Sequence, residues 1–271
     1  MPLWFAVVLL GVIEGITEFL PVSSTGHLLV AEHWLGKQML ALGDKDLFTV
    51  VIQSGAVLAV LPLFPQRLNQ FFTRWREAST KDYLLKILVA FAITGAGGLV
   101  LEKKHFKLPE TVLPIAIALL AGGILFVVVE MWLKDKPHKD QVSWPIVLAV
   151  GIGQLIAAIF PGSSRSGVTI LLALILSLNR VAATEFSFLV GIPTMLAASG
   201  LKIFKALHHP AANGQHENWS MVALGFVVAA VVSFIAVKWL LKYVQTHTFI
   251  AFGWYRIGLA LLLFLMFRKE L

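Results

Sequence analysis

Hydrophobic residues fill long segments of the chain, and short polar stretches separate these segments. A helix that crosses a bilayer needs about 20 mostly apolar residues, and six segments come close to that length. The six segments are 46–65, 83–101, 109–133, 186–205, 219–243 and 248–268. The pattern therefore predicts an all-α polytopic membrane protein with six full spans.

Four further apolar segments form two pairs, 2–20 with 22–35 and 144–160 with 163–178. A proline interrupts each pair, at Pro21 and at Pro161, and two serines follow it closely. Proline lacks the N–H that would continue a helix. Non-helical backbone at membrane depth is tolerated only where protein or a watery cavity covers it. We therefore expect each pair to form a re-entrant helical hairpin.

The two hairpins resemble copies of one unit. A shift of 140 residues pairs Gly11 with Gly151, Glu14 with Gln154, Pro21 with Pro161, Ser23 with Ser163 and Ser24 with Ser164. Three spans follow each hairpin, so each half crosses the membrane an odd number of times and the halves must be inverted. Inverted repeats place a site at their interface near the midplane. We expect a single integral membrane domain over 1–271, with internal repeats of about 1–135 and 140–271.

Composition agrees with a membrane protein. Of the 271 residues, 58% are hydrophobic and 14% are charged, whereas about 25% of the residues in a soluble domain are charged. The net charge of +7 suits anionic headgroups or a diphosphate and does not indicate nucleic-acid binding. The chain has no cysteine, which excludes disulfides and thiol chemistry. Lysine and arginine divide almost evenly between the two predicted faces, so they do not fix the orientation.

The stretch 14–27, EGITEFLPVSSTGH, carries carboxyl, hydroxyl and imidazole groups in apolar surroundings. Glu14 and Glu18 are four residues apart, which puts both carboxylates on one helix face. Two such carboxylates need a shared proton or a cation between them. Mg²⁺ and Ca²⁺ prefer oxygen ligands, so we expect a divalent cation of this kind there. Gln53 either faces this site and binds substrate or makes a hydrogen bond in the core.

Three hydroxyl residues follow Pro21 and begin the second helix of the first hairpin. We expect Ser23 to be the N-cap, whose oxygen accepts from a backbone N–H two or three residues on, and also to contact the substrate. Ser24 or Thr25 is then the nucleophile, and Ser24 is favoured because His27, three residues later, shares its helix face. The imidazole can carry a proton near neutral pH. The free N–H groups of the helix end attract phosphate.

The second hairpin contributes a cation. Arg165 stands between the pair Ser163 and Ser164 and the following Ser166. We expect Ser163 to be a helix cap, and all three serines to contact the substrate. A guanidinium at mid-membrane needs an anion, so Arg165 should bind phosphate. Alternatively, Arg165 forms a structural ion pair with one of the two glutamates. In either case the two proline turns should lie within reach of each other.

Four motifs connect the chain with a known family. They are EGxTEFLPVSSTGH at 14–27, PGxSRSG at 161–167, VIQxGA at 51–56 and AxEFSF at 183–188. Motifs of this length are far more specific than a single short pattern. They resemble those of the bacterial undecaprenyl-diphosphate phosphatases, intramembrane enzymes also known for bacitracin resistance. The resemblance covers nearly the whole chain, with a small departure at Ser163, where a bulkier residue is expected.

The resemblance implies hydrolysis of undecaprenyl diphosphate to undecaprenyl phosphate and phosphate. This reaction recycles the lipid carrier for peptidoglycan synthesis and gives bacitracin resistance. The resemblance also implies a multi-pass protein of the bacterial inner (plasma) membrane, with an active site that opens to the periplasmic face. As partners we expect the polyprenyl diphosphate and membrane lipids, no nucleic acid, and, as an open alternative, a second copy in a homodimer.

For this chemistry we expect Ser24 or Thr25 to attack the terminal phosphorus while His27 or a glutamate moves the proton. Arg165 and the helix N-termini would hold the phosphates, and the lipid tail would lie in a lateral groove. A lipid or anion transporter or flippase with the same inverted-repeat fold is the main alternative. Another lipid-phosphatase superfamily needs a histidine and an aspartate after the Ser-Arg pair. It is excluded because residues 166–184 contain neither.

Overall fold

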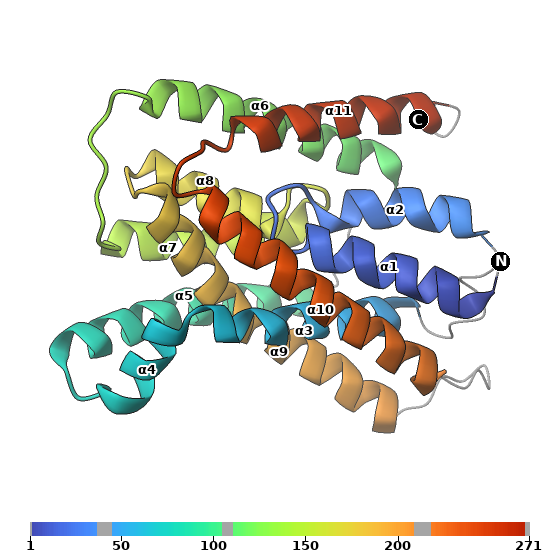
Figure 1. The fold of residues 1–271 in the computed structure, drawn as a ribbon, viewed down its shortest axis with the longest axis horizontal. Coiled ribbons are helices and arrows are strands. Elements are labelled where there is room, and N and C mark those ends of the chain that lie inside the picture. The colour runs from blue at the N-terminus through green and yellow to red at the C-terminus, as the bar shows by residue number, and fades with distance from the viewer. Residues whose placement is uncertain (1, 37–44, 105–110, 209–217, 269–271) are drawn as a thin grey trace.

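The computed structural model describes residues 2–36, 45–104, 111–208 and 218–268. Over these ranges the chain is helical, which confirms the predicted all-helical class (Figure 1). The helices are α1 (Leu3–Thr17), α2 (Ser24–Leu35), α3 (Lys45–Val60), the 3-10 helix η2 (Leu61–Leu63), α4 (Pro65–Thr73), α5 (Ala78–Lys103), α6 (Val112–Leu133), α7 (Trp144–Ile159), α8 (Arg165–Ile175), α9 (Arg180–His208), α10 (Trp219–Tyr243) and α11 (Ile250–Met266).

Four of the described helices, α5, α6, α9 and α10, are long and apolar enough to cross a bilayer. They correspond to the predicted spans 83–101, 109–133, 186–205 and 219–243. The predicted span 46–65 belongs to a bent pair, because the chain turns by 78° where Pro65 opens α4. Helix α11 has 17 residues, or about 25 Å of helix, and is not counted as a candidate span. The described residues thus contain four candidate spans, or five with the bent pair.

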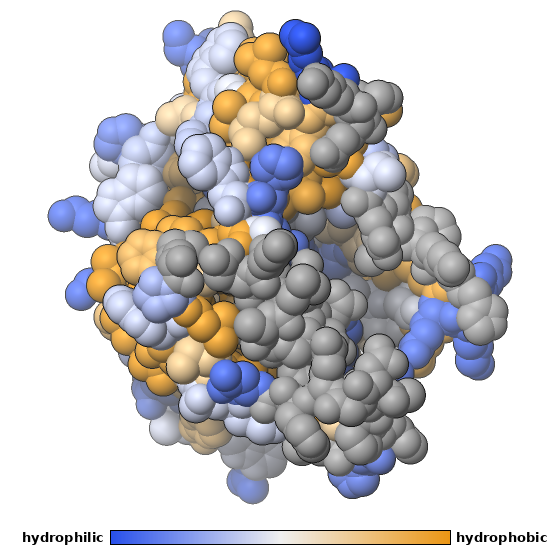
Figure 2. Space-filling view, turned by 90° about the vertical axis from the view of Figure 1, so that its right-hand side faces the viewer, coloured by the Kyte–Doolittle hydropathy of each residue, from blue (hydrophilic) through white to orange (hydrophobic). Residues whose placement is uncertain are grey.

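The outward faces of the helices are apolar. Leu88 on α5, Val128 on α6 and Ile235 on α10 are each more than half exposed. A soluble protein rarely exposes hydrophobic surface so widely, whereas lipid tails suit it. Figure 2 shows the end of the molecule that carries the N-terminus, where hydrophilic residues stand mainly around the rim. These surfaces agree with a multi-pass membrane protein.

Helix α1 packs closely on α10 and thereby carries an acidic side chain into the interior. A Cβ at Gly15 would lie 2.7 Å from the backbone oxygen of Ala229 on α10. Small residues permit such close approach between helices in a membrane. Glu14, the preceding residue, is fully buried. After Thr17 the chain turns through Pro21 and continues as α2 beside α1 (Figure 1).

The two hairpin turns share a serine cap with left-handed backbone. Ser23 caps α2 with φ 74°, and its Oγ accepts from the N–H of Gly26 at 3.4 Å. Ser164 caps α8 with φ 68°, and its Oγ accepts from the N–H of Gly167 at 3.2 Å. The prediction of Ser23 as N-cap is confirmed, whereas the prediction that Ser163 is the cap is wrong.

The physical reason is a difference in turn length. The two prolines are 140 positions apart, but the capping serines, and the glycines to which they bond, are 141 apart. The second turn therefore contains one more residue than the first. As a result Arg165, and not Ser164, takes the place in α8 that Ser24 takes in α2, the first position of the helix.

The helix contacts in one half of the chain have counterparts in the other half. Helix α1 packs on α10 as α7 packs on α5, and α3 packs on α10 as α9 packs on α5. Helix α3 also contacts α9, and α6 contacts α11. These contacts keep their form when α1, α3, α5 and α6 are exchanged with α7, α9, α10 and α11, respectively. This arrangement brings the two hairpin turns together between the halves.

Candidate functional site

The two proline turns are in direct contact. Ser166 Oγ donates to the backbone oxygen of Leu20 at 3.2 Å. Arg165 Nη2 lies 3.0 Å from Glu18 Oε1, although 147 positions separate these residues in the chain. The prediction that the turns lie within reach of each other is confirmed. Their depth in the membrane remains a prediction.

A polar pocket of about 130 Å³ lies where the turns meet. Its lining consists of Glu18, Ser23, Ser24, Thr25, Gln53, Ala157, Pro161, Gly162, Ser164 and Arg165. Seven of the residues predicted for the site thus line one cavity, and both hairpins contribute to it. Glu14, His27, Ser163 and Ser166 are not in the lining. The free N–H groups at the start of α2 and α8 are close to this pocket, as an anion site requires.

Glu18 connects a hydroxyl with a guanidinium inside the polar pocket. One carboxylate oxygen, Oε2, accepts a hydrogen bond from Ser24 Oγ at 2.9 Å. The other, Oε1, accepts from Arg165 Nη2 at 3.0 Å. Only 7% of the Glu18 side chain is exposed. A carboxylate at this distance from a serine hydroxyl can take its proton when the oxygen attacks.

Arg165 keeps a donor available. Its Nη2 contacts Glu18 and also lies 2.8 Å from Met195 Sδ, whereas its buried Nη1 has no partner in the part of the chain that the structure describes. A buried donor of this kind stabilises an anion that enters the pocket. Gly191 on α9 provides the space, because a Cβ there would overlap with Nη1. The sequence reasoning missed Gly191, although a glycine inside a long apolar helix is a signal of close packing.

Glu14 is fully buried. Neither of its carboxylate oxygens accepts a hydrogen bond from a described residue. Glu18, Gln53 and Arg165 are near enough to act on it electrostatically. The described residues contain no cluster of three or more His, Cys, Asp or Glu side chains that could hold a metal. A cation here would therefore take oxygen from the two glutamates and from the Gln53 amide, a donor set that suits Mg²⁺ or Ca²⁺.

The second half holds a neutral counterpart of Glu14. Gln154 Nε2 donates to Thr94 Oγ1 at 2.9 Å, and Thr94 Oγ1 lies 3.2 Å from the backbone oxygen of Gly151. An amide here needs no counter-ion, so the second half can bury it without a cation. The negative charge of the site therefore comes from the first hairpin alone, and the positive charge from the second.

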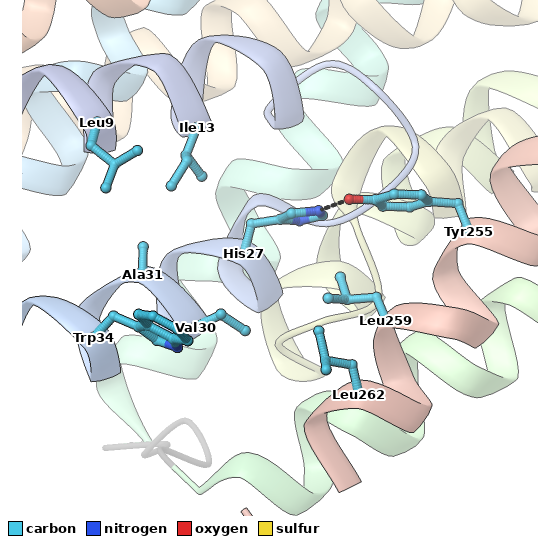
Figure 3. A pocket seen from close by; sticks show the side chains of 9 residues that line it. All are labelled: Leu9, Ile13, His27, Val30, Ala31, Trp34, Tyr255, Leu259 and Leu262. Atoms are coloured by element: carbon cyan, nitrogen blue, oxygen red, sulfur yellow. Dashed lines mark hydrogen bonds between the residues drawn. The ribbon is translucent and has the colours of Figure 1, made fainter. Parts of the chain in front are cut away.

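His27 lies outside the polar pocket. Its ring lines an apolar groove of about 350 Å³, made by Leu9, Ile13, His27, Val30, Ala31, Trp34, Tyr255, Leu259 and Leu262 of α1, α2 and α11 (Figure 3). Nδ1 lies 2.7 Å from the backbone oxygen of Ser23. Nε2 points at Tyr255 and lies 2.6 Å from its hydroxyl oxygen.

The prediction that Ser24 and His27 work from one helix face is therefore wrong. The Ser24 hydroxyl turns to Glu18, which offers a charged acceptor, whereas His27 turns to α11. The backbone carbonyl of Ser23 also holds the imidazole, because it accepts from Nδ1. Since Ser23 also lines the polar pocket, His27 marks the boundary between the polar pocket and the apolar groove.

Arg256 is a further residue that the sequence reasoning missed. It is completely buried on α11. Its guanidinium donates to the backbone oxygens of Pro21 at 3.3 Å, Gly162 at 3.3 Å and Ser163 at 2.8 Å, and also reaches carbonyls of α6. Arg256 thus connects both hairpin turns. An arginine in the middle of the apolar segment 248–268 was the available signal, because such a charge must be satisfied.

Ser163 and Ser166 support the turns instead of lining the pocket. The backbone oxygen of Ser163 accepts from Arg256, and its hydroxyl has no partner among the described residues. Ser166 Oγ bonds the Leu20 carbonyl and lies 3.1 Å from Ser164 Oγ. Of the three serines predicted to contact substrate from this hairpin, only Ser164 lines the polar pocket.

The chain matches known proteins over nearly its whole length. Residues 7–262 match the sequence model of a family described as "Bacitracin resistance protein BacA". An undecaprenyl-diphosphatase of Rhizobium etli is 50% identical over 256 residues, which are 94% of both chains. One of Xylella fastidiosa is 47% identical over 260 residues, 96% of this chain and 97% of that protein. One of Xanthomonas axonopodis pv. citri is 47% identical over 260 residues, 95% of both.

Proposed function

Because the chain belongs to the family of bacitracin resistance protein BacA, we propose that it hydrolyses undecaprenyl diphosphate to undecaprenyl phosphate and phosphate. Relatives that share about half of their residues with this chain, over nearly the full length of both, carry the name undecaprenyl-diphosphatase. The main support is a pair of hydrogen bonds at one carboxylate: Glu18 accepts from the Ser24 hydroxyl and from the Arg165 guanidinium. Hydrolysis at this site recycles the lipid carrier for cell-wall synthesis and confers bacitracin resistance, in a bacterial inner membrane with the pocket open to the periplasm.

In the first step Ser24 Oγ attacks the terminal phosphorus. The bond from Oγ to phosphorus forms, and the bond from phosphorus to the bridging oxygen breaks. Glu18 takes the hydroxyl proton, as its 2.9 Å contact supports. Arg165 and the helix N-termini stabilise the charge on the phosphoryl oxygens, which is the main requirement in phosphoryl transfer. Thr25, also in the lining, contacts a phosphate oxygen.

The leaving group is undecaprenyl phosphate. We place its phosphate at the boundary between the polar pocket and the apolar groove, and its prenyl chain in the apolar groove. The contact between Ser23, which lines the polar pocket, and His27, which lines the apolar groove, supports this placement. A protonated His27 gives its proton to the bridging oxygen as the phosphorus–oxygen bond breaks. In the second step water attacks the phosphoserine, His27 takes a proton from the water, and Glu18 returns its proton to Ser24 Oγ.

A divalent cation, Mg²⁺ or Ca²⁺, fits beside this pocket. Glu14 and Glu18, with Gln53, are the residues that would hold it, and the unpartnered oxygens of Glu14 support this role. When bound, the cation supplies positive charge to the phosphate oxygens. The positive charge of the cation would then offset the cost of burying the Glu14 carboxylate.

For the architecture we propose six spans and two re-entrant hairpins in an inverted repeat, with repeats of about 1–135 and 140–271. The exchange of helix contacts between the halves supports this plan. So does the pair of capping serines with matching left-handed backbone. In this plan α3 with α4 and α11 complete the six crossings, and the hairpins α1–α2 and α7–α8 end at the site near mid-membrane.

A transporter or flippase shares the inverted repeat, so the test must separate transport from chemistry. Purified protein in detergent has no membrane to cross, and release of phosphate from undecaprenyl diphosphate then reports hydrolysis alone. We expect release by the wild type, loss in Arg165→Ala, and normal release in Arg74→Ala, which removes an exposed arginine outside the site. Binding of the substrate without any release by the wild type would favour the transporter.

A further inference from the structure

Tyr255 on α11 is the side chain that completes the surroundings of His27. Its hydroxyl oxygen lies 2.6 Å from Nε2 of the imidazole. The two rings are parallel within 6°, with centroids 5.5 Å apart. The remaining ring nitrogen of His27, Nδ1, is held by the Ser23 carbonyl at 2.7 Å. Both nitrogens of the imidazole are therefore occupied, and the ring has one orientation (Figure 3).

These contacts determine where the protons are. A carbonyl oxygen can only accept, so Nδ1 of His27 must carry a proton in every state. In the neutral imidazole, Nε2 then has a free lone pair, and the Tyr255 hydroxyl donates to it. In the imidazolium, Nε2 carries a proton and the same hydroxyl oxygen accepts it. A phenol hydroxyl suits both states, whereas a carboxylate or an ammonium group would favour one of them.

We propose that Tyr255 relays the proton of His27 in the hydrolysis. Nε2 of the imidazolium gives its proton to the Tyr255 hydroxyl oxygen while that hydroxyl gives its own proton to the bridging oxygen of the leaving phosphate. When water attacks the phosphoserine, both transfers run in reverse, so Tyr255 is a neutral phenol after each step. This inference rests on the proposed function, in which the proton of His27 reaches the bridging oxygen and a proton from water later returns to the imidazole.

The test compares kcat and KM for phosphate release from undecaprenyl diphosphate by full-length protein in detergent. Tyr255→Phe keeps the ring and removes the hydroxyl. We expect its kcat to fall about 100-fold or more, as when a proton-transfer group is removed, and its KM to stay within about twofold. Tyr243→Phe is the matched control, because Tyr243 also stacks on a histidine, His247, at 4.4 Å, but away from the site. It should behave as wild type.

A double-mutant cycle separates proton relay from packing. His27→Ala should lose most activity, and adding Tyr255→Phe to it should lose little more, because the two residues transfer one proton in series. A normal kcat in Tyr255→Phe overturns the inference. A loss that appears in KM assigns Tyr255 to the binding of the lipid chain, and multiplying losses assign it a separate role, so both outcomes also overturn it. Unchanged turnover in His27→Ala removes the role of His27, while phosphate release by the wild type still supports the hydrolase.

Discussion

Glu18 is the residue that receives contacts from both halves of the chain. It accepts from Ser24 of the first hairpin and from Arg165 of the second. The sequence left open whether Arg165 would bind phosphate or pair with a glutamate, and the structure shows an ion pair with Glu18. Within the described part of the chain, nothing accepts from the buried Nη1 of Arg165, so the ion pair leaves this donor available to an anion.

Replacing Glu18 with Gln should abolish most turnover while the protein still folds. The amide keeps the shape of the side chain but takes a proton poorly, and general acid–base catalysis contributes about 10²–10⁴-fold. We expect kcat for phosphate release to fall at least about 100-fold, with a normal elution volume in size-exclusion chromatography. Full activity of Glu18→Gln would contradict the proton transfer from Ser24.

Replacing Ser24 with Ala should remove the nucleophile and leave binding intact. Arg165 and the helix N-termini remain, so substrate affinity measured by direct binding should stay close to that of the wild type. Turnover should fall on the order of 10³-fold or more, as it does when a nucleophile is deleted. Thr25→Ala is the comparison, since Thr25 lines the same pocket, and it should lose less. The reverse ranking would make Thr25 the nucleophile.

Glu14 provides a test of the cation. A chelator should lower the activity of the wild type, and added Mg²⁺ or Ca²⁺ should restore it. Glu14→Gln should have low activity that neither treatment changes, because the amide removes one of the two carboxylates that bind the cation. Titration of Mg²⁺ or Ca²⁺ in an activity assay gives the measurement. Equal activity with and without chelator in the wild type contradicts the cation site.

Helix α9 contributes a glycine to the site, and the missing side chain leaves space for the Arg165 guanidinium. Gly191 faces the Arg165 guanidinium, whereas Gly200 on the same helix faces open space. Gly191→Ala should push the guanidinium aside and lower kcat/KM on the order of 100-fold, since a shift of about 1 Å can have that effect. Gly200→Ala makes the same change of residue in α9 without a contact and should keep wild-type activity. Equal activity of the two variants would show that the arginine adapts.

The sequence predicted the elements well and the orientation of side chains less well. The apolar segments and their prolines predicted both helical hairpins. The length of an apolar segment and the N–H that proline lacks are local properties of the sequence. Ser23 was recognised as a cap for the same reason. The extra residue in the second turn was missed, because serines at 163 and 164 allow two alignments and only the bond to Gly167 decides between them. The position of His27 depended on Tyr255, 228 positions away, which no local pattern reveals.

For the molecule as a whole, Arg256 connects the halves. It donates to carbonyls of both turns from a fully buried position. Arg256→Lys should destabilise the fold, because an ammonium group cannot reach all of these acceptors and each buried acceptor left unsatisfied costs about 1–3 kcal/mol. We expect a lower thermal unfolding midpoint and reduced turnover. Arg74→Lys, at an exposed position, should change neither. An unchanged midpoint in Arg256→Lys would contradict the connecting role.

The apolar groove affects how the concentration of substrate should be expressed. Leu9, Trp34, Tyr255 and Leu262 in its lining are all at least one-third exposed on the outer surface of the helices. A prenyl chain can therefore enter sideways and remain in hydrocarbon throughout. The encounter is then two-dimensional diffusion, and its rate depends on the mole fraction of substrate among the surrounding amphiphiles. Extra detergent at constant substrate molarity should slow the reaction by dilution within the micelle, without any inhibition of the protein.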